Sequence, residues 1–299
     1  MYQPPLPVFE EPLIGRVVNV ATVPQRSPFR YPGGKTWLVP YIRRWLTRLP
    51  VRPVEMIEPF AGGAIVGLTA VFEGYVDRVT LVELDEEVAA VWQTILDENG
   101  GGQWLADEIL RFDLTPESVR AVLSTPARSL REKAFRTILK NRVNRGGILA
   151  QGAGLVRHGE DGKGLRSRWY PLTLRKRILD IVAIRDRIRF VHGDGMEVWK
   201  LNSQRPDAVF FIDPPYTAGG KMAGIRLYSC SELDHEELFR ISNGLKGDFL
   251  MTYDSSDEIA ALAHRYGLST LLVRMKNTHH TRMNELLIGR SVDWAQPAA

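Results

Sequence analysis

The order of apolar and polar residues along the first third of the chain predicts alternating helices and strands. Apolar side chains recur at helical spacing between residues 37 and 49, at Leu38, Tyr41, Ile42, Trp45 and Leu46. Two short β-rich runs, 54–58 and 78–83, are each followed by a helical pattern, at about 64–72 and at 86–96. This alternation is typical of an α/β fold with a parallel sheet.

The pattern changes in the middle of the chain and then returns. Residues 99–184 contain basic helices and a glycine-rich stretch, 145–164, without clear strands. Strands are indicated again at 188–191, 208–212 and 249–253, and near 270–275 and 285–289. We therefore expect one α/β domain interrupted by an insertion. The expected divisions are an N-terminal arm (1–26), two halves of the α/β domain (27–98 and 186–292), the inserted region (99–185) and a tail (293–299).

Composition excludes several classes of protein. The 299 residues, 44% hydrophobic and 25% charged, have ordinary globular proportions, which excludes a disordered, collagen-like or coiled-coil chain. The single cysteine, Cys230, excludes an internal disulfide and a cysteine-based zinc cage. No apolar run approaches the roughly 20 residues that span a bilayer, and the N-terminus lacks the features of a secretory signal. We expect a soluble, cytoplasmic protein.

The net charge of +4 is the sum of two regions of opposite sign. Between Arg128 and Arg189 there are 17 Lys and Arg against 5 Asp and Glu, a local charge of +12, and the other 22 basic and 30 acidic residues give −8. A basic block in an acidic chain is typical of a segment that neutralises phosphates. The alternative for its first part, 128–136, is a solvated helix face. The block favours a nucleic-acid partner.

A glycine-rich turn, Pro59-Phe60-Ala61-Gly62-Gly63, follows the first expected strand. Glycines there allow the backbone to turn tightly and approach a ligand, and the helix that follows offers free N–H groups. The turn lacks the GxGxxG pattern of dinucleotide-binding proteins. Glu83, 20 positions after Gly63, ends the second strand, where a carboxylate can accept both hydroxyls of a ribose. The two features together favour a nucleoside ligand, whereas the glycines alone indicate only a turn.

The segment Asp213-Pro214-Pro215-Tyr216 directly follows the apolar strand 208–212. Ligands of open α/β sheets bind outside the carboxyl ends of the strands. Two prolines remove two backbone donors and fix two φ angles, so that the corner is rigid and offers mainly acceptors. The carboxylate and a proline carbonyl can accept both N–H bonds of a planar amino group while the tyrosine stacks on its ring. The alternative is a proline corner before an exposed loop.

Taken together, these segments resemble the Dam-like family of DNA N6-adenine methyltransferases, which use S-adenosylmethionine. The resemblance covers about residues 27–290, with the motifs in the order of the family's alpha arrangement. In chain order the matching segments are 30–35, 59–63, 82–85, 192–194, 213–216, 250–255 and 284–288. The resemblance implies a Rossmann-like methyltransferase sheet with an inserted, mainly helical target-recognition domain. The implied activity is site-specific methylation of adenine in DNA.

The resemblance also implies the roles of individual residues. The catalytic corner is Asp213, Pro214, Pro215 and Tyr216. The residues at the cofactor are Tyr31, Lys35, Phe60, Gly62, Glu83, Asp194 and Asp213. Alternatives are a solvated lysine at a helix N-terminus for Lys35 and a helix cap for Asp194. S-adenosylmethionine is the expected cofactor, without a metal ion.

The inserted region departs from the sequence of Dam itself. Dam has an aromatic-containing Asn-Arg segment and a DNA-reading hairpin where this chain has residues 141–147 followed by a glycine-rich stretch, so Dam's GATC site is not implied. The candidate DNA contacts are Arg142, Arg145, Arg166 and Arg168. Trp169 is either a wedge between bases or a core residue, and the core is favoured. We expect the enzyme to be a monomer that binds double-stranded DNA. We expect no association with a membrane.

Other functions stay open at this point. An Asp-Pro-Pro-aromatic corner also serves RNA adenine methyltransferases, although the long basic insertion favours DNA. Enzymes that methylate N4 of cytosine more often carry Ser at the first position of the corner. A non-catalytic DNA-binding module would be expected to lose Tyr31, Lys35, Glu83 or Asp213, and all four are present. The sequence leaves open whether the enzyme belongs to a restriction-modification pair with a cognate restriction endonuclease. The alternatives are an orphan enzyme and a phage-encoded one.

Overall fold

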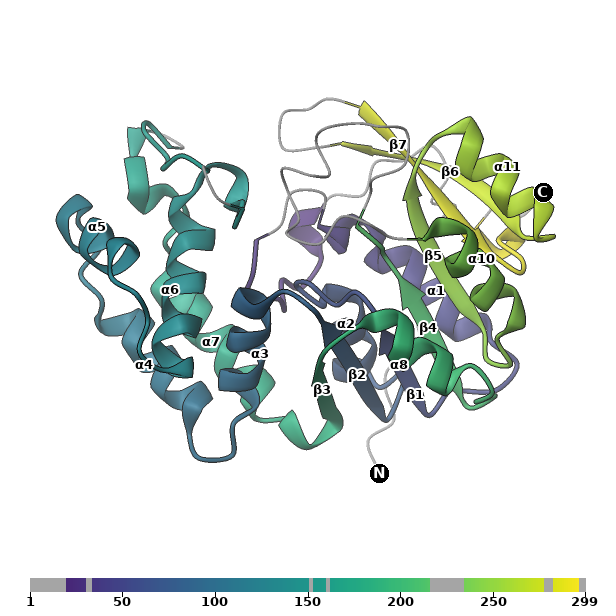
Figure 1. Ribbon diagram of the computed structural model, residues 1–299, viewed down its shortest axis with the longest axis horizontal. Helices are drawn as coiled ribbons and strands as arrows, with labels where there is room; N and C mark the ends of the chain where they lie inside the picture. The colour runs from purple at the N-terminus through teal and green to yellow at the C-terminus, as the bar shows by residue number, and fades with distance from the viewer. Residues whose placement is uncertain are drawn as a thin grey trace.

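A seven-stranded sheet runs through the molecule, with helices on both of its faces (Figure 1). The computed structural model describes residues 20–30, 34–150, 153–159, 162–215, 234–276 and 282–295. Tyr31 and Tyr216, which the sequence assigned to the site, lie outside these residues. No helix in the described ranges is long and apolar enough to cross a membrane.

The strand order is β3-β2-β1-β4-β5-β7-β6. The strands are β1 (Glu55–Glu58), β2 (Arg78–Glu83), β3 (Ile188–His192), β4 (Ala208–Ile212), β5 (Phe249–Asp254), β6 (Ser269–Lys276) and β7 (Arg282–Gly289). The first five are parallel in the doubly wound order, and β7 is antiparallel to both β5 and β6. The expected Rossmann-like α/β fold is therefore confirmed, with a mixed sheet in place of a purely parallel one.

Helices cover the sheet on both faces because its central strands are apolar on both sides. In β4, Val209 and Phe211 belong to one apolar cluster, while Phe210 and Ile212 belong to another. This alternation is the two-residue period of a strand. On the first face lie α1 (Val39–Arg48), α2 (Ile65–Phe72) and α3 (Glu86–Leu96), and on the second α8 (Gly195–Asn202), α10 (His235–Gly244) and α11 (Asp257–Arg265).

Two of these helices, α10 and α11, were not predicted from the apolar pattern. Each begins at a capping residue. The side chain of Asp234 accepts the N–H of Glu237, and the side chain of Ser256 accepts that of Ile259. Such caps satisfy N–H groups that the first turn of a helix leaves unpaired. These polar capping residues therefore mark where the two helices begin.

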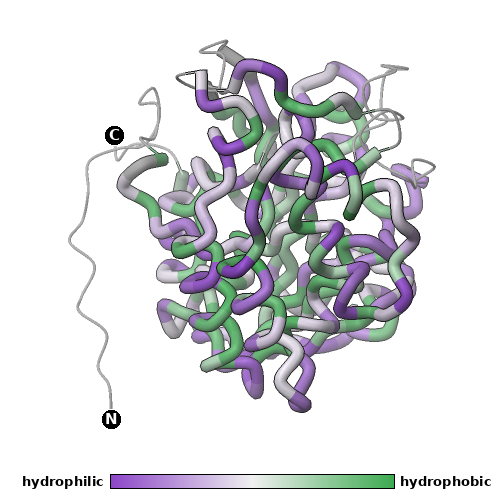
Figure 2. The backbone as a smooth tube through the Cα atoms, turned by 90° about the vertical axis from the view of Figure 1, so that its left-hand side faces the viewer, coloured by the Kyte–Doolittle hydropathy of each residue, from purple (hydrophilic) through white to green (hydrophobic). Residues whose placement is uncertain are grey.

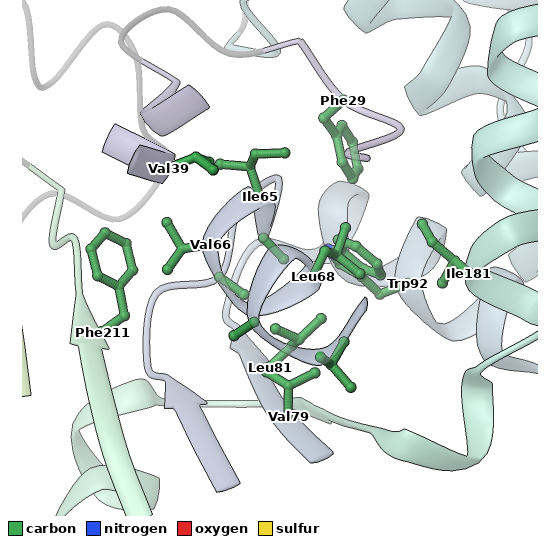
Figure 3. Packing of buried hydrophobic residues seen from close by; sticks show 14 of the residues in the cluster. Phe29, Val39, Ile65, Val66, Leu68, Val79, Leu81, Trp92, Ile181 and Phe211 are labelled. Atoms are coloured by element: carbon green, nitrogen blue, oxygen red, sulfur yellow. The ribbon is translucent and has the colours of Figure 1, made fainter. Parts of the chain in front are cut away.

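In the described part of the inserted region, four α-helices lie on the side of α3, on the left in Figure 1: α4 (Gly101–Arg111), α5 (Pro116–Ser124), α6 (Leu130–Val143) and α7 (Pro171–Val182). Figure 2, which faces this side, shows hydrophilic and hydrophobic stretches alternating along the chain. The apolar stretches join the core, since Ile181 of α7 and Trp92 of α3 belong to one cluster (Figure 3). The core therefore continues across the expected boundary at residue 99.

Part of the basic block pairs with acidic side chains of α3 and the residues that follow it. Lys133 and Lys140 of α6 lie 3.0 and 2.6 Å from Glu86 and Glu87, and Arg131 lies 3.1 Å from Asp97. These cations offset charges of the α/β body. Fewer cations of the block are therefore left to contact phosphates than its local charge of +12 suggests.

Residues 20–26, the described part of the expected N-terminal arm, pack against the body. Val23 is buried in the core shared with α1 and α2. Arg26 forms an ion pair of 3.2 Å with Glu73, and its guanidinium lies 4.6 Å from the ring centre of Phe72. This part of the chain is thereby tied to the end of α2.

Replacing Gly195 with Ala is expected to destabilise the fold. Gly195 starts α8, and a Cβ there would lie 1.9 Å from the carbonyl oxygen of Pro59. Overpacking of this kind costs about 1–3 kcal/mol. The matched control is Gly244→Ala, where a Cβ would meet nothing within 4 Å. Urea unfolding should give a lower free energy of unfolding for Gly195→Ala alone, and equal values for the two variants would contradict the contact.

Candidate functional site

Carboxylates stand at the carboxyl ends of the three adjacent strands β2, β1 and β4. Glu58 and Glu83 end β1 and β2, and Asp213 directly follows β4. Because these strands are parallel, their carboxyl ends share one edge. The strand order reverses at β1, between β2 on one side and β4 on the other, and such switch points are where doubly wound sheets bind ligands.

Glu83 braces the glycine-rich turn that follows β1. Its Oε2 accepts the N–H of Gly62 at 2.9 Å, and its Oε1 accepts those of Leu84 and Asp85, both at 2.9 Å. Burial raises the pKa of Glu83, although these three N–H groups oppose that shift. Since a carboxylate has about four acceptor positions, three are already filled. The carboxylate as it stands has room for one ribose hydroxyl, not the two expected from the sequence.

The turn itself adopts a conformation that suits close contact with a ligand. Gly62 has a φ of 47°, in the left-handed region that glycine adopts without steric strain. Its carbonyl oxygen accepts the indole N–H of Trp92 at 2.9 Å. Ala64 also has a positive φ, 49°, at the start of α2. Strain of this kind in a residue other than glycine clusters at functional sites. Phe60, partly buried, packs against the second apolar cluster.

Asp194 caps α8, which is the alternative that the sequence left open. Its carboxylate accepts the N–H of Met196 at 2.8 Å, and its side chain is exposed. The preceding Gly193 donates its N–H to the carbonyl oxygen of Glu83 at 3.0 Å. Asp194 thus lies beside the end of β2, near Glu83, and its expected contact with a cofactor adenine stays a prediction.

Lys35 joins two carboxylates in the interior of the site. Its Nζ lies 3.0 Å from Oδ1 of Asp213 and 2.7 Å from Oε1 of Glu285 in β7. Burial lowers the pKa of Lys35, but the two carboxylates outweigh burial and hold that pKa above its ordinary value. With only 5% of its surface exposed, Lys35 is not the solvated lysine of the alternative interpretation. Its contacts in this structure are with Asp213 and Glu285.

Asp213 is held by a second donor on the same oxygen. The hydroxyl of Thr252, in β5, donates to Oδ1 at 2.9 Å. Pro214 is buried and Pro215 partly buried. Lys35 and Thr252 together fix the direction in which the Asp213 carboxylate points.

Glu58 is a member of the site that the sequence analysis missed. It is buried and accepts the N–H of Gly67 in the first turn of α2. Burial raises the pKa of Glu58 to about 8, against the Gly67 N–H, and the negative charge of Asp213 adds to the rise. The signal in the sequence was a carboxylate at the end of a buried strand, directly before the segment that the sequence analysis named for its glycines.

Glu285 and Thr252 were also missed, because their place depends on strand register. Glu285 stands opposite Asp254, and since β7 is antiparallel to β5, the beginning of β7 lies at the carboxyl edge of β5. The available signal was one acidic residue in the apolar run 284–288, since buried charges are rarely left unpaired. Beside them, the phenol of Tyr253 contacts Nδ1 of His235 at 2.8 Å.

The four candidate DNA-binding arginines have different environments. Arg145 and Arg166 are exposed and Arg168 is partly buried. Arg142 is only 5% exposed and donates to the carbonyl oxygen of Pro28 at 2.6 Å, so the expectation that it lies on the DNA-facing surface is wrong. Trp169 is buried and lies edge-on to Phe112, which confirms its place in the core.

No protein-family model matches the chain, and no curated protein matches it in sequence. Among solved structures, it is similar to a putative RNA methyltransferase from Pyrococcus horikoshii (TM-score 0.42, 8% identity, 90% of this chain and 92% of that one). It is also similar to an rRNA methyltransferase from Streptomyces viridochromogenes (TM-score 0.39, 14% identity, 85% and 84%). A third is precorrin-6y C5,15-methyltransferase from Geobacter metallireducens (TM-score 0.34, 11% identity, 83% and 86%). At these TM-scores, activity has to be argued from the site itself.

Replacing Glu58 with Gln is expected to flatten the pH dependence of stability. The pKa of Glu58 rises on folding from 4.5 to about 8, so between these values the folded state holds a proton that the unfolded state has lost. The contribution of Glu58 to stability should therefore be full below pH 4.5 and be lost as the pH rises toward 8, at up to about 1.4 kcal/mol per pH unit.

Urea unfolding at pH 5 and pH 8 measures this effect. The free energy of unfolding of Glu58→Gln should change less between the two pH values than that of the wild type. The matched control is Glu117→Gln on α5, whose side chain is 74% exposed. If the Glu58→Gln protein kept the full pH dependence, the shift would not belong to Glu58.

Proposed function

We propose that this protein transfers a methyl group from S-adenosylmethionine to the N6 amino group of an adenine, in duplex DNA. The observation that carries the proposal is the corner Asp213-Pro214-Pro215 at the end of β4, where Lys35 and Thr252 orient the carboxylate. This corner lies on the same sheet edge as the glycine turn after β1. A nucleoside cofactor at the turn and an amino group at the corner would therefore meet at the switch point.

The residues at the ends of β1 and β2 suit S-adenosylmethionine. Oε2 of Glu83, which accepts one N–H, would also accept a ribose hydroxyl, and the left-handed turn at Gly62 would allow close approach of the backbone. Phe60 and Asp194 border the same turn, and Tyr31 is the expected aromatic neighbour. When bound, the cofactor supplies an electrophilic methyl group on a positively charged sulfur. No group of three or more His, Cys, Asp or Glu side chains in the described residues is arranged to hold a metal ion.

Asp213 and the Pro214 carbonyl would activate the amino group by holding both of its N–H bonds. The lone pair of an aromatic amine is delocalised into the ring and is a poor nucleophile, and two acceptors favour a pyramidal nitrogen whose lone pair is available. The group formed by Lys35, Asp213 and Glu285 has one net negative charge. This charge would stabilise the positive charge that develops on the amino nitrogen of the adenine. The proton can leave to water after the transfer, so Asp213 does not have to accept it. Positioning and electrostatics carry this mechanism.

The choice of DNA rests on the inserted region and on the resemblance to the Dam-like family. An adenine in a duplex must be flipped out before its amino group can reach the corner, at a cost of a few kcal/mol, and Tyr216 is the expected stacking partner. Arg145, Arg166 and Arg168, in the insertion, are the expected DNA contacts. RNA is the second candidate substrate, because the same type of corner serves RNA adenine methyltransferases. A restriction-modification role stays a prediction.

The test is transfer of a tritiated methyl group from S-adenosylmethionine to plasmid DNA and to ribosomal RNA. We expect label in the N6-methyladenine of DNA, and none with Asp213→Ala, because the amino group then loses its charged acceptor. Thermal unfolding should show that the variant is folded. The matched control is Asp186→Ala, a side chain 92% exposed, which should keep full activity.

Each result decides between the candidates. Label in RNA alone would replace DNA by the second candidate. Near-normal transfer by a folded Asp213→Ala protein would overturn the proposed mechanism. Absence of label in both nucleic acids, with the wild-type protein folded and S-adenosylmethionine bound, would overturn the proposed function.

Replacing Thr252 with Val is expected to lower kcat more than it raises KM. Thr252 is fully buried and donates to Asp213, so its loss leaves the fold but frees one constraint on the carboxylate. Lost orientation acts on the reacting amine more than on the binding of the nucleic acid. We expect kcat to fall by roughly tenfold to a hundredfold, since a small displacement of this kind can cost about 100-fold. Thr252→Ser, which keeps the hydroxyl, should restore most of the rate, and equal loss in both variants would contradict the role of the hydrogen bond.

A further inference from the structure

A cavity of about 340 Å³ lies between the segment 24–26, the end of α2 and α7. Pockets for small ligands begin at about 300 Å³. Gln25 and Thr173 of the lining are exposed, so the cavity is open to solvent. The charged residues of the lining are one carboxylate, Asp180, and three cations, Arg26, Lys176 and Arg177.

The cavity is separate from the site of the proposed methyl transfer. Phe72, which belongs to the lining, is the last residue of α2. This helix begins beside the glycine turn at the carboxyl edge of the sheet, and its eight residues span about 12 Å. The lining therefore lies at the other end of α2 from the turn at Gly62.

Arg177 is a partly buried cation without a carboxylate beside it. Lys176 lies 2.6 Å from Asp180, and Arg26 has an ion pair of its own with a glutamate at the end of α2. Arg177 instead donates to the backbone carbonyl oxygen of Ser27 at 3.2 Å, and no carboxylate forms an ion pair with it among the residues that the structure describes. Burial lowers the pKa of Arg177, yet a guanidinium stays charged at neutral pH. Charges taken from water are usually paired, so this one is poised for an anion.

A second unpaired arginine lies next to Arg177. Arg142 of α6 donates to the carbonyl oxygen of Pro28 at 2.6 Å, so the two arginines hold adjacent carbonyl groups of one segment. Burial lowers the pKa of Arg142 to about 9, and the charge of Arg177 adds to that shift. Nε of Arg142 and Nε of Arg26 are buried and have no acceptor in the described part of the chain. Two positive charges beside the cavity are thus left without a carboxylate there.

We propose that this cavity binds the phosphate group of a small phosphorylated molecule. A phosphomonoester carries about 1.5 to 2 negative charges at pH 7, which matches the two unpaired arginines. Guanidinium groups fit phosphate oxygens, and the exposed hydroxyl of Thr173 adds a neutral donor. The repulsion from Asp180 is reduced by its ion pair with Lys176.

The position of the cavity favours a small molecule over a nucleic acid. It is a concave site between two helices and a chain segment, away from the carboxyl edge where a target base would enter. The inference goes beyond the proposed function and does not depend on it.

The test is isothermal titration calorimetry of the full chain with ribose 5-phosphate, inorganic phosphate and ribose, in a phosphate-free buffer at pH 7.5. The two phosphates should bind and ribose should not. Arg177→Gln should weaken the binding of both by about tenfold or more, since charge-assisted hydrogen bonds are lost. Its unfolding temperature without ligand should stay the same or rise, because an unpaired charge is removed. Ribose 5-phosphate should raise the unfolding temperature of the wild type more than that of the variant.

The matched control is Arg175→Gln, two positions away on the same helix. Arg175 lies outside the lining and pairs with Asp107 at 3.3 Å, so its replacement should leave phosphate binding as in the wild type. Lys176→Gln changes a side chain that is 75% exposed, and it tests the site even if Arg177→Gln does not fold. It should weaken binding by up to about fivefold, as expected for an exposed charge.

Each contrary result has a distinct meaning. Absence of phosphate binding by the folded wild type would overturn the inference, as would equal affinities in Arg177→Gln, Lys176→Gln and the control. If only a fluorescein-labelled duplex DNA bound, and Arg177→Gln weakened it, the occupant would be a nucleic-acid backbone and not a small molecule. Phosphate binding by a protein that transfers no methyl group would overturn the proposed function and leave this site standing.

Discussion

One buried cation shared by two carboxylates holds the site together. Lys35 contacts Asp213 after β4 and Glu285 in β7, and it comes from a segment that precedes the first strand. Charges in the interior are stable only when they are paired, so loss of any one member leaves another uncompensated. Three distant parts of the chain therefore have to be in place at the same time for the Asp213 carboxylate to have its orientation.

The segment that carries Lys35 is anchored to the insertion as well as to the sheet. Asn141 holds the backbone of Arg30, and Phe29 packs near Trp92, whose indole donates to Gly62 in the turn after β1. Phe29 and Arg30 thus contact α3 and α6, and Lys35, five residues after Arg30, contacts Asp213.

Much of the fold followed from local patterns. The predicted limits of β2, α3 and β4 are those observed, because apolar periodicity within a segment already defines a strand or a helix. The carboxylates at strand ends could also be predicted, because an acidic residue after an apolar run indicates the carboxyl edge of a parallel sheet. Glu83 and Asp213 were found in this way. The antiparallel pairing of β7 with β5 was not predicted, because the sequence of each strand alone does not show which distant strand it pairs with.

The sequence by itself determined the α/β alternation, the strand-end carboxylates and the rigid corner after β4, all of which depend on neighbours along the chain. Tertiary structure decided which charges meet. It buried Lys35 between two carboxylates, moved Arg142 from the expected surface into the interior, and paired Lys133 and Lys140 with α3. Electrostatic energy depends on distance and burial, so the same cation is solvated, paired or buried according to what the fold places beside it.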